Sequence, residues 1–311
     1  MGAGSSGGLV GALAPHTPDR WNDKKQFQFD SLIMAPDWWD GVGRLSGFDP
    51  GYVRGGRLQP LQDKRAVDLA RARATDARKN WHGLAAWEVR SEADGDWAPV
   101  SKSRMYLFDT ISARLHPRQS ARALGGALRA LGCSVHVKGA GTPEGKVIEA
   151  TGVAGLLELS QALGRTVGNG VKGQSALFAC DARERPQLFA DGLHIVPHSD
   201  GTVAVGSTSE REFEAPDSVD HQIEDVISKA RELCPALREA KVIERWAGVR
   251  PRARSRAPTL GRHPLRPDNF IANGGFKIGF GMAPKVAEVM AELVLEGRDI
   301  IPDGFRPEAS L

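Results

Sequence analysis

A glycine-rich stretch near the C-terminus constrains the fold of this chain more than any other feature. Residues 269–272 predict a short strand, four glycines follow closely, and Pro284 suits the first turn of a helix. Apolar residues from Val286 to Val294 recur at helical spacing, and Gly297 predicts the helix end. Glycine lets a backbone approach a ligand, and a helix N-terminus attracts electron-rich groups. The unit therefore predicts a site for an anion or an electron-rich ring, with an ordinary tight strand-to-helix connection as the alternative.

Alternating arginines mark a second stretch just upstream. Arg250, Arg252, Arg254 and Arg256 would share one face of an extended segment. Such a stripe could bind phosphates, or Arg250 alone could hold a carboxylate through its planar fork. The net charge of +3 is small and no aromatic residue separates the arginines, so we expect no RNA site here.

Together the two stretches resemble the FAD-dependent oxidoreductases of the D-amino acid oxidase and glycine oxidase type. In that family a Trp-Ala-Gly-hydrophobic-Arg-Pro segment precedes a hydrophobic-Gly turn, as residues 246–251 precede Leu260-Gly261 here. A Gly-(His/Gly)-Phe-(Arg/Lys)-x-Gly-x-x-x-Ala-Pro segment follows, as at residues 274–284. Residues 150–152 (Ala-Thr-Gly) and 172–174 (Lys-Gly-Gln) are similar to further landmarks of the family.

The resemblance implies a mixed α/β (α+β) fold. In it, an N-terminally truncated, Rossmann-like FAD-binding domain is interleaved with an antiparallel β-sheet substrate domain. The FAD-binding segments would span about 1–16, 133–165 and 246–311, and the substrate-domain segments about 17–132 and 166–245.

The N-terminus departs from the family pattern. Residues 2–7 match G-x-G-x-x-G, but no strand precedes them, as a dinucleotide fingerprint requires. Residues 6–15 instead resemble the segment after the family's first βαβ unit, where a turn opens a helix beside the flavin. We therefore expect the chain to start after that unit and to bind FAD poorly by itself.

By resemblance, this flavoprotein is an oxidoreductase that oxidises the C–N bond of a small amine or amino acid. Hydride would pass to FAD, the imine would hydrolyse, and oxygen or another acceptor would take the electrons. Arg250 and Lys277 would face the substrate's acid group, His194 would stand where the family has a tyrosine, and no general base is needed. The expected FAD contacts are Ser6, Gly11, Ala12, Leu13, Val135, Thr151, Gly152, Gly248, Gly274, Gly275, Phe276, Ile278, Gly279 and Phe280.

Two other functions stay open. The segment at residues 6–15 also resembles the flavin domain of the bifunctional enzyme that modifies the wobble uridine of tRNA. Alternatively, the chain is a catalytically silent truncated remnant, or one half of a split enzyme.

Composition narrows the location and the partners. Three widely spaced cysteines favour a reducing compartment, and neither they nor the eight histidines show metal-ligand spacing. No apolar run reaches the roughly 18 residues of a membrane span, and the N-terminus does not resemble a signal peptide. We expect a cytoplasmic protein with a small-molecule substrate, no membrane and no nucleic-acid partner.

Periodicity and turn residues predict the remaining elements. Helices are expected over 21–48, 65–81, 117–131 and 222–234, and strands over 85–92, 104–108, 134–137, 146–151, 175–181, 193–197 and 202–206, with a hairpin turn at 199–201.

Overall fold

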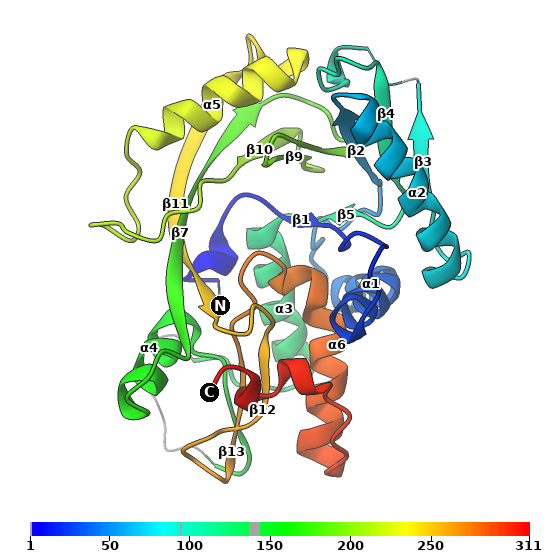
Figure 1. Ribbon diagram of the computed structural model, residues 1–311. Helices are drawn as coiled ribbons and strands as arrows, with labels where there is room; N and C mark the ends of the chain where they lie inside the picture. The colour runs from blue at the N-terminus through cyan, green and yellow to red at the C-terminus, as the bar shows by residue number, and fades with distance from the viewer. Residues whose placement is uncertain (1, 92, 94, 137–143) are drawn as a thin grey trace.

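The computed structural model describes residues 2–91, 93, 95–136 and 144–311. These residues form a large sheet, a small sheet and a two-stranded sheet of β1 and β5, with helices packed around them (Figure 1). The strands are β1 (Ala12–Leu13), β2 (Arg57–Leu61), β3 (Trp87–Arg90), β4 (Met105–Asp109), β5 (Ala113–Arg114), β6 (Val147–Glu149), β7 (Gly168–Ala179), β8 (Gln187–Ala190), β9 (Leu193–Pro197), β10 (Thr202–Gly206), β11 (Lys241–Ala253), β12 (Thr259–Arg262) and β13 (Asn269–Asn273). The helices are α1 (Asp23–Ser46), α2 (Lys64–Asn80), α3 (Pro117–Ala130), α4 (Gly152–Ala162), α5 (Gln222–Leu233) and α6 (Gly279–Ala291).

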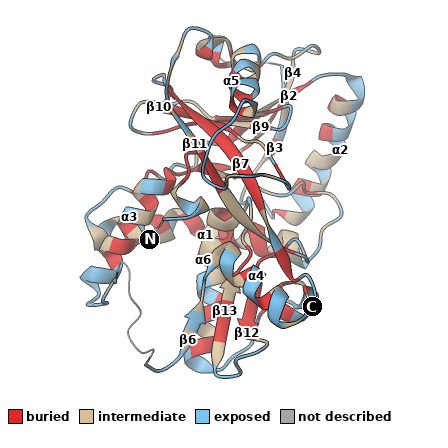
Figure 2. Cartoon of the chain, turned by 90° about the vertical axis from the view of Figure 1, so that its left-hand side faces the viewer, coloured by how far each residue is buried: buried red, intermediate tan, exposed pale blue. Residues whose placement is uncertain are grey.

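The large sheet has eight strands in the order β11-β7-β10-β9-β8-β2-β4-β3. Its ladders are antiparallel except for β2 with β8. The longest ladder joins β11 to β7, so residues 246–253 are held along a strand that is buried for most of its length (Figure 2). Helix α5 packs over β7, β9 and β10 through its apolar face, with Ile223, Val226 and Ile227 buried.

Helices α1, α3 and α6 pack together below the large sheet (Figure 1). Helix α1 begins where the side chain of Asn22 accepts a hydrogen bond from the Lys25 amide, and it ends at Gly47, whose φ of 69° is left-handed. Its buried face carries Leu32 and Trp39, both fully enclosed. Of the aromatic residues predicted to lie in a helix between residues 21 and 48, Phe27, Phe29 and Trp39 are buried in the core, whereas Trp38 lines a large cavity and Phe48 is exposed.

The small sheet has the order β12-β13-β6, in which β13 runs parallel to β6 and antiparallel to β12. Its connections bring residues 147–152, 259–262 and 269–275 to one end of the helical layer. No helix among the described residues is both long and apolar enough to cross a membrane.

Most predicted elements are confirmed, and four expectations are wrong. Residues 6–15 open no helix: they form a 3-10 turn (Ser5–Gly7) and strand β1, because β1 pairs with β5 and a Cβ on Gly11 would stand 1.9 Å from the Leu115 carbonyl oxygen. The described part of the expected strand 134–137 is irregular and pairs with no strand, and residue 137 lies outside the described range.

The remaining two corrections concern the two C-terminal stretches. Helix α6 begins at Gly279, so Pro284 lies inside it and not in its first turn. In this early turn, Gly281 is buried and faces Leu13 and Leu32. The arginine stripe is also interrupted: β11 ends at Ala253, and Arg256 adopts a turn conformation with φ of 59°.

Candidate active site

A cavity of about 1580 Å³ opens between β11, the small sheet and the start of α6. Pockets for drug-sized ligands usually measure roughly 300–1,000 Å³, so this one has room for a large cofactor and a small substrate. Of the expected cofactor contacts, the residues that line it are Ser6, Thr151, Gly152, Gly248, Gly274, Gly275, Phe276 and Gly279.

The other expected contacts lie elsewhere. Strand β1, with Gly11, Ala12 and Leu13, pairs with β5 outside the lining, and Leu13 is buried in the core. Ile278 and Phe280 pack into hydrophobic clusters. Val135 lines a separate cavity of about 360 Å³ beside α3. Nearness to the glycine turn in the sequence therefore did not indicate which side chains line the cavity and which point away from it.

The glycine turn leaves a flat space in this cavity. A Cβ on Gly275 would stand 3.0 Å from the Gly279 Cα, and one on Gly248 would stand 2.4 Å from the Trp246 ring. The first turn of α6 has no side-chain cap at Ile278, so its amide groups keep free hydrogen-bonding capacity. A planar, electron-rich ring such as that of FAD fits this combination of small residues and helix N-terminus.

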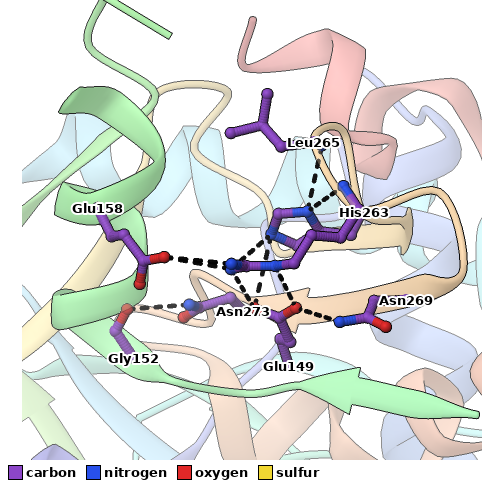
Figure 3. A network of polar contacts seen from close by, with 8 residues as sticks. Glu149, Gly152, Glu158, His263, Leu265, Asn269 and Asn273 are labelled. Atoms are coloured by element: carbon purple, nitrogen blue, oxygen red, sulfur yellow. Dashed lines mark hydrogen bonds and ion pairs between the residues drawn. The ribbon is translucent and has the colours of Figure 1, made fainter. Parts of the chain in front are cut away.

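A polar network lies beside the cavity, at the small sheet and the start of α4, and includes two residues of the lining, Gly152 and Asn273 (Figure 3). Asn273 donates a hydrogen bond of 2.9 Å from Nδ2 to the Gly152 carbonyl oxygen, which holds the start of α4 against the end of β13. Glu149 accepts hydrogen bonds from Asn269 (2.7 Å) and from two nitrogens of Arg266 (2.8 and 2.7 Å). The turn at residues 150–152 is therefore anchored on both sides by the small sheet.

Arg250 lies on β11 between Val249 and Pro251, which line the cavity, but it does not itself belong to the lining. Its guanidinium donates hydrogen bonds to the Ser207 hydroxyl and, at 3.5 Å, to the Thr208 carbonyl oxygen. The group lies directly over Gly173, where a Cβ would stand 2.0 Å from an Arg250 nitrogen. Burial lowers the pKa of Arg250 to about 10, although the charge of Glu210 opposes this shift.

Near Arg250 lies a polar cluster made of the buried residues Lys172, Gln174 and Glu210 and the exposed Asp220. Lys172 Nζ lies 3.5 Å from Glu210 Oε2 and 3.6 Å from Asp220 Oδ2. Gln174 Nε2 donates to Glu210 Oε1 (3.1 Å) and to Asp220 Oδ1 (2.8 Å). Two positive charges, on Lys172 and Arg250, thus face two negative ones.

The three residues expected to bind substrate lie within electrostatic reach of one another. The pKa of Lys277 is lowered by desolvation and then by the charge of Arg250, although the side chain as a whole is exposed. The pKa of His194 falls to about 3, mainly through burial and then through the charges of Arg57 and Lys277. His194 is therefore neutral at pH 7, and its Nδ1 has no hydrogen-bond partner.

Sequence reasoning missed the partners of these side chains. Arg57 stacks on Phe189 and pairs with Asp109, with a nitrogen–oxygen distance of 2.9 Å between two buried groups. Neither Arg57 nor Glu210 belongs to a recognisable motif. Only Lys172 and Gln174, in the Lys-Gly-Gln landmark, offered a sequence signal.

Comparisons with known proteins agree with this geometry. The family model described as "FAD dependent oxidoreductase" matches residues 1–293. The chain is 25% identical over 321 residues to a glycine oxidase of Bacillus subtilis, covering 95% of this chain and 84% of the relative. A glycine oxidase of Bacillus licheniformis is 34% identical over 113 residues, which is 35% of this chain and only 29% of that relative.

Among solved structures, the crystal structure of glycine oxidase from Geobacillus kaustophilus superposes with a TM-score of 0.83 at 20% identity, covering 98% of this chain and 89% of that one. This likeness confirms the fold expected from the sequence. Because the family model spans nearly the whole chain and the cavity fits a flat ring at a helix N-terminus, the protein belongs to the FAD-dependent oxidoreductase family.

Proposed function

We propose that the chain oxidises the C–N bond of a small amino acid or amine that carries a carboxylate. FAD, when bound against the glycine turn and the α6 N-terminus, supplies the two-electron acceptor. The relatives' printed activity, glycine oxidation, supports this class of substrate. Among the described residues, neither Arg250 nor Lys277 pairs with a carboxylate, and this observation carries the proposal.

The charges around the cavity support a single carboxylate on the substrate. Lys172 and Arg250 are balanced by Glu210 and Asp220, and Arg57 is balanced by Asp109. Lys277 then remains as one uncompensated positive charge. The carboxylate of an amino acid could pair with this charge, whereas a simple amine such as methylamine has no group that could.

The protein's own contribution is orientation. The fork of Arg250 is fixed by Ser207 and Thr208, so it can present two N–H groups to a carboxylate in one plane. His194 is neutral, so it adds no charge beside the acid group and can offer or accept one hydrogen bond. We assign no general base to any described residue, in keeping with the sequence expectation.

Three further assignments belong to the same proposal. Residues 1–16, 133–165 and 246–311 form the FAD-binding part, since β6, β12 and β13 all fall within them. The electron acceptor is oxygen or another small oxidant. The protein works in the cytoplasm, which agrees with three unpaired cysteines.

The test is anaerobic reduction of the flavin at saturating FAD. We expect glycine, N-methylglycine or D-alanine to bleach the visible flavin band, and methylamine to leave it unchanged at the same concentration. Equal reduction by methylamine and glycine would refute the carboxylate requirement. No reduction by any amino acid, with flavin bound, would refute the proposed reaction.

A further inference from the structure

Two histidines and one aspartate meet on the far side of the large sheet from α5, outside the proposed active site. His116 caps the N-terminus of α3, His198 follows β9, and Asp200 lies in the turn to β10. One ligand atom from each residue lies within 4.8 Å of the others. Residues more than 80 positions apart in sequence are therefore brought together by the packing of α3 against the β9–β10 hairpin.

The ring of His198 is buried and contributes one of the three ligand atoms of this cluster. The Thr202 hydroxyl donates to Asp200 Oδ1 at 2.7 Å, so its oxygen accepts from His198 Nδ1 at 3.2 Å. Nδ1 then carries the ring's only hydrogen, and Nε2 keeps its lone pair. His198 is only 1% exposed, and Nε2 has no hydrogen-bond partner, although the Leu9 carbonyl lies near the ring. A buried lone pair without a donor is the state that a metal ion would satisfy.

His116 and Asp200 supply the remaining donors. His116 Nε2 lies 3.6 Å from Asp200 Oδ2, and the two imidazole rings have their centres 4.5 Å apart. Asp200, Ser199 and Gln119 also line a cavity of about 310 Å³, which gives an ion and its water a route to the site. The backbone amide of Gln119 donates a long hydrogen bond of 3.5 Å to His116 Nδ1, so this helix cap is weak.

We propose that His116, His198 and Asp200 bind a divalent transition-metal ion of the zinc class. Two imidazole nitrogens and one carboxylate oxygen suit Zn²⁺ or Co²⁺ better than Mg²⁺ or Ca²⁺, which prefer oxygen ligands. Zinc–ligand distances of about 2.0–2.2 Å place tetrahedral ligands roughly 3.4 Å apart. His116 Nε2 and Asp200 Oδ2, which are 3.6 Å apart, already have about this spacing. The exposed turn at Asp200 would move to bring the remaining ligand atoms closer together.

The bound ion would join the β9–β10 hairpin to the first turn of α3. It would keep a water molecule in its fourth position, since the described part of the chain supplies three protein ligands. The site is independent of FAD and of Arg250, so it can be tested without turnover.

The experiment uses metal-stripped chain purified without a polyhistidine tag and titrated with Co²⁺ and then Zn²⁺. We expect one equivalent to bind, with a cobalt absorption spectrum of tetrahedral type and a raised melting temperature. Asp200→Asn and His198→Gln should each weaken binding at least tenfold. The matched controls Asp37→Asn and His221→Gln change exposed residues elsewhere and should bind as the unaltered chain does.

The proposal is overturned if the unaltered chain binds no stoichiometric metal, or if Asp200→Asn binds as tightly as Asp37→Asn. It is also overturned if cobalt shows an octahedral spectrum that none of the four variants changes. If His198→Gln does not fold, the exposed Asp200 variant decides the matter, since its side chain lies on a surface turn.

Discussion

Replacing Arg250 should separate substrate binding from cofactor binding. Burial lowers the pKa of Arg250 from 12.5 to about 10, a desolvation cost of roughly 3 kcal/mol at 1.36 kcal/mol per pKa unit. A substrate carboxylate offsets this cost when it accepts both N–H groups of the fork. Loss of one charge-assisted hydrogen bond of about 1.5–3 kcal/mol corresponds to roughly ten- to a hundredfold in affinity.

We therefore expect Arg250→Ala to raise the KM for glycine or N-methylglycine by about that factor, with the flavin spectrum unchanged. Arg250→Lys should not restore the lower KM, because a single ammonium cannot contact Ser207, Thr208 and the substrate in one plane. Arg71→Ala, which removes an exposed arginine from α2, is the matched control. The assay is initial-rate kinetics at saturating FAD. Unchanged KM and kcat in Arg250→Ala would show that the acid group binds elsewhere.

Three further predictions follow from particular contacts. Gly173→Ala should also raise KM, by displacing the Arg250 guanidinium that lies within 2.0 Å of the new methyl position, and an unchanged KM would contradict the packing argument. Asn273→Ala should weaken FAD binding several-fold in a fluorescence titration by releasing the Gly152 carbonyl, whereas identical affinity would show that this turn is held by other contacts. The folded-state pKa of His194 is about 3, below its ordinary 6.5, so only the unfolded chain takes up this proton between those values. Stability is therefore complete above pH 6.5 and falls on acidification, by about 2 kcal/mol at pH 5. Urea unfolding of the unaltered chain and His194→Gln should differ in this slope.

The helices show which parts of the fold the periodicity of apolar residues can predict. The apolar spacing of α5 and the proline at the start of α3 predicted both elements within about a turn, because these signals act over a few residues. Helix α6 began a turn and a half earlier than expected, and the buried residues Gly281 and Met282 of this turn pack against segments distant in sequence. Strand β1 was missed for a similar reason, since its pairing partner β5 lies about 100 residues away.

In the candidate site, too, some residues could be predicted from local sequence and others could not. Local sequence indicated Arg250, Lys277 and the glycine turn. The glycine turn lines the cavity, whereas Arg250, Lys277 and His194 lie within electrostatic reach of one another outside its lining, and their roles stay predictions. Lys172, Glu210 and Asp220 could not be linked to Arg250 from sequence, because their pairing depends on a segment that returns across β7.

The sequence by itself determined the family, the amphipathic elements and the residue types able to hold an acid group beside a flat ring. These follow from short-range patterns, which depend only on residues close together in the sequence. The tertiary structure alone decided which of those residues face the cavity and which pack into the core. It also decided how far burial shifts the pKa values of Arg250 and His194, and whether His116, His198 and Asp200 meet. Desolvation and ligand geometry depend on segments distant in sequence, so no local pattern can specify them.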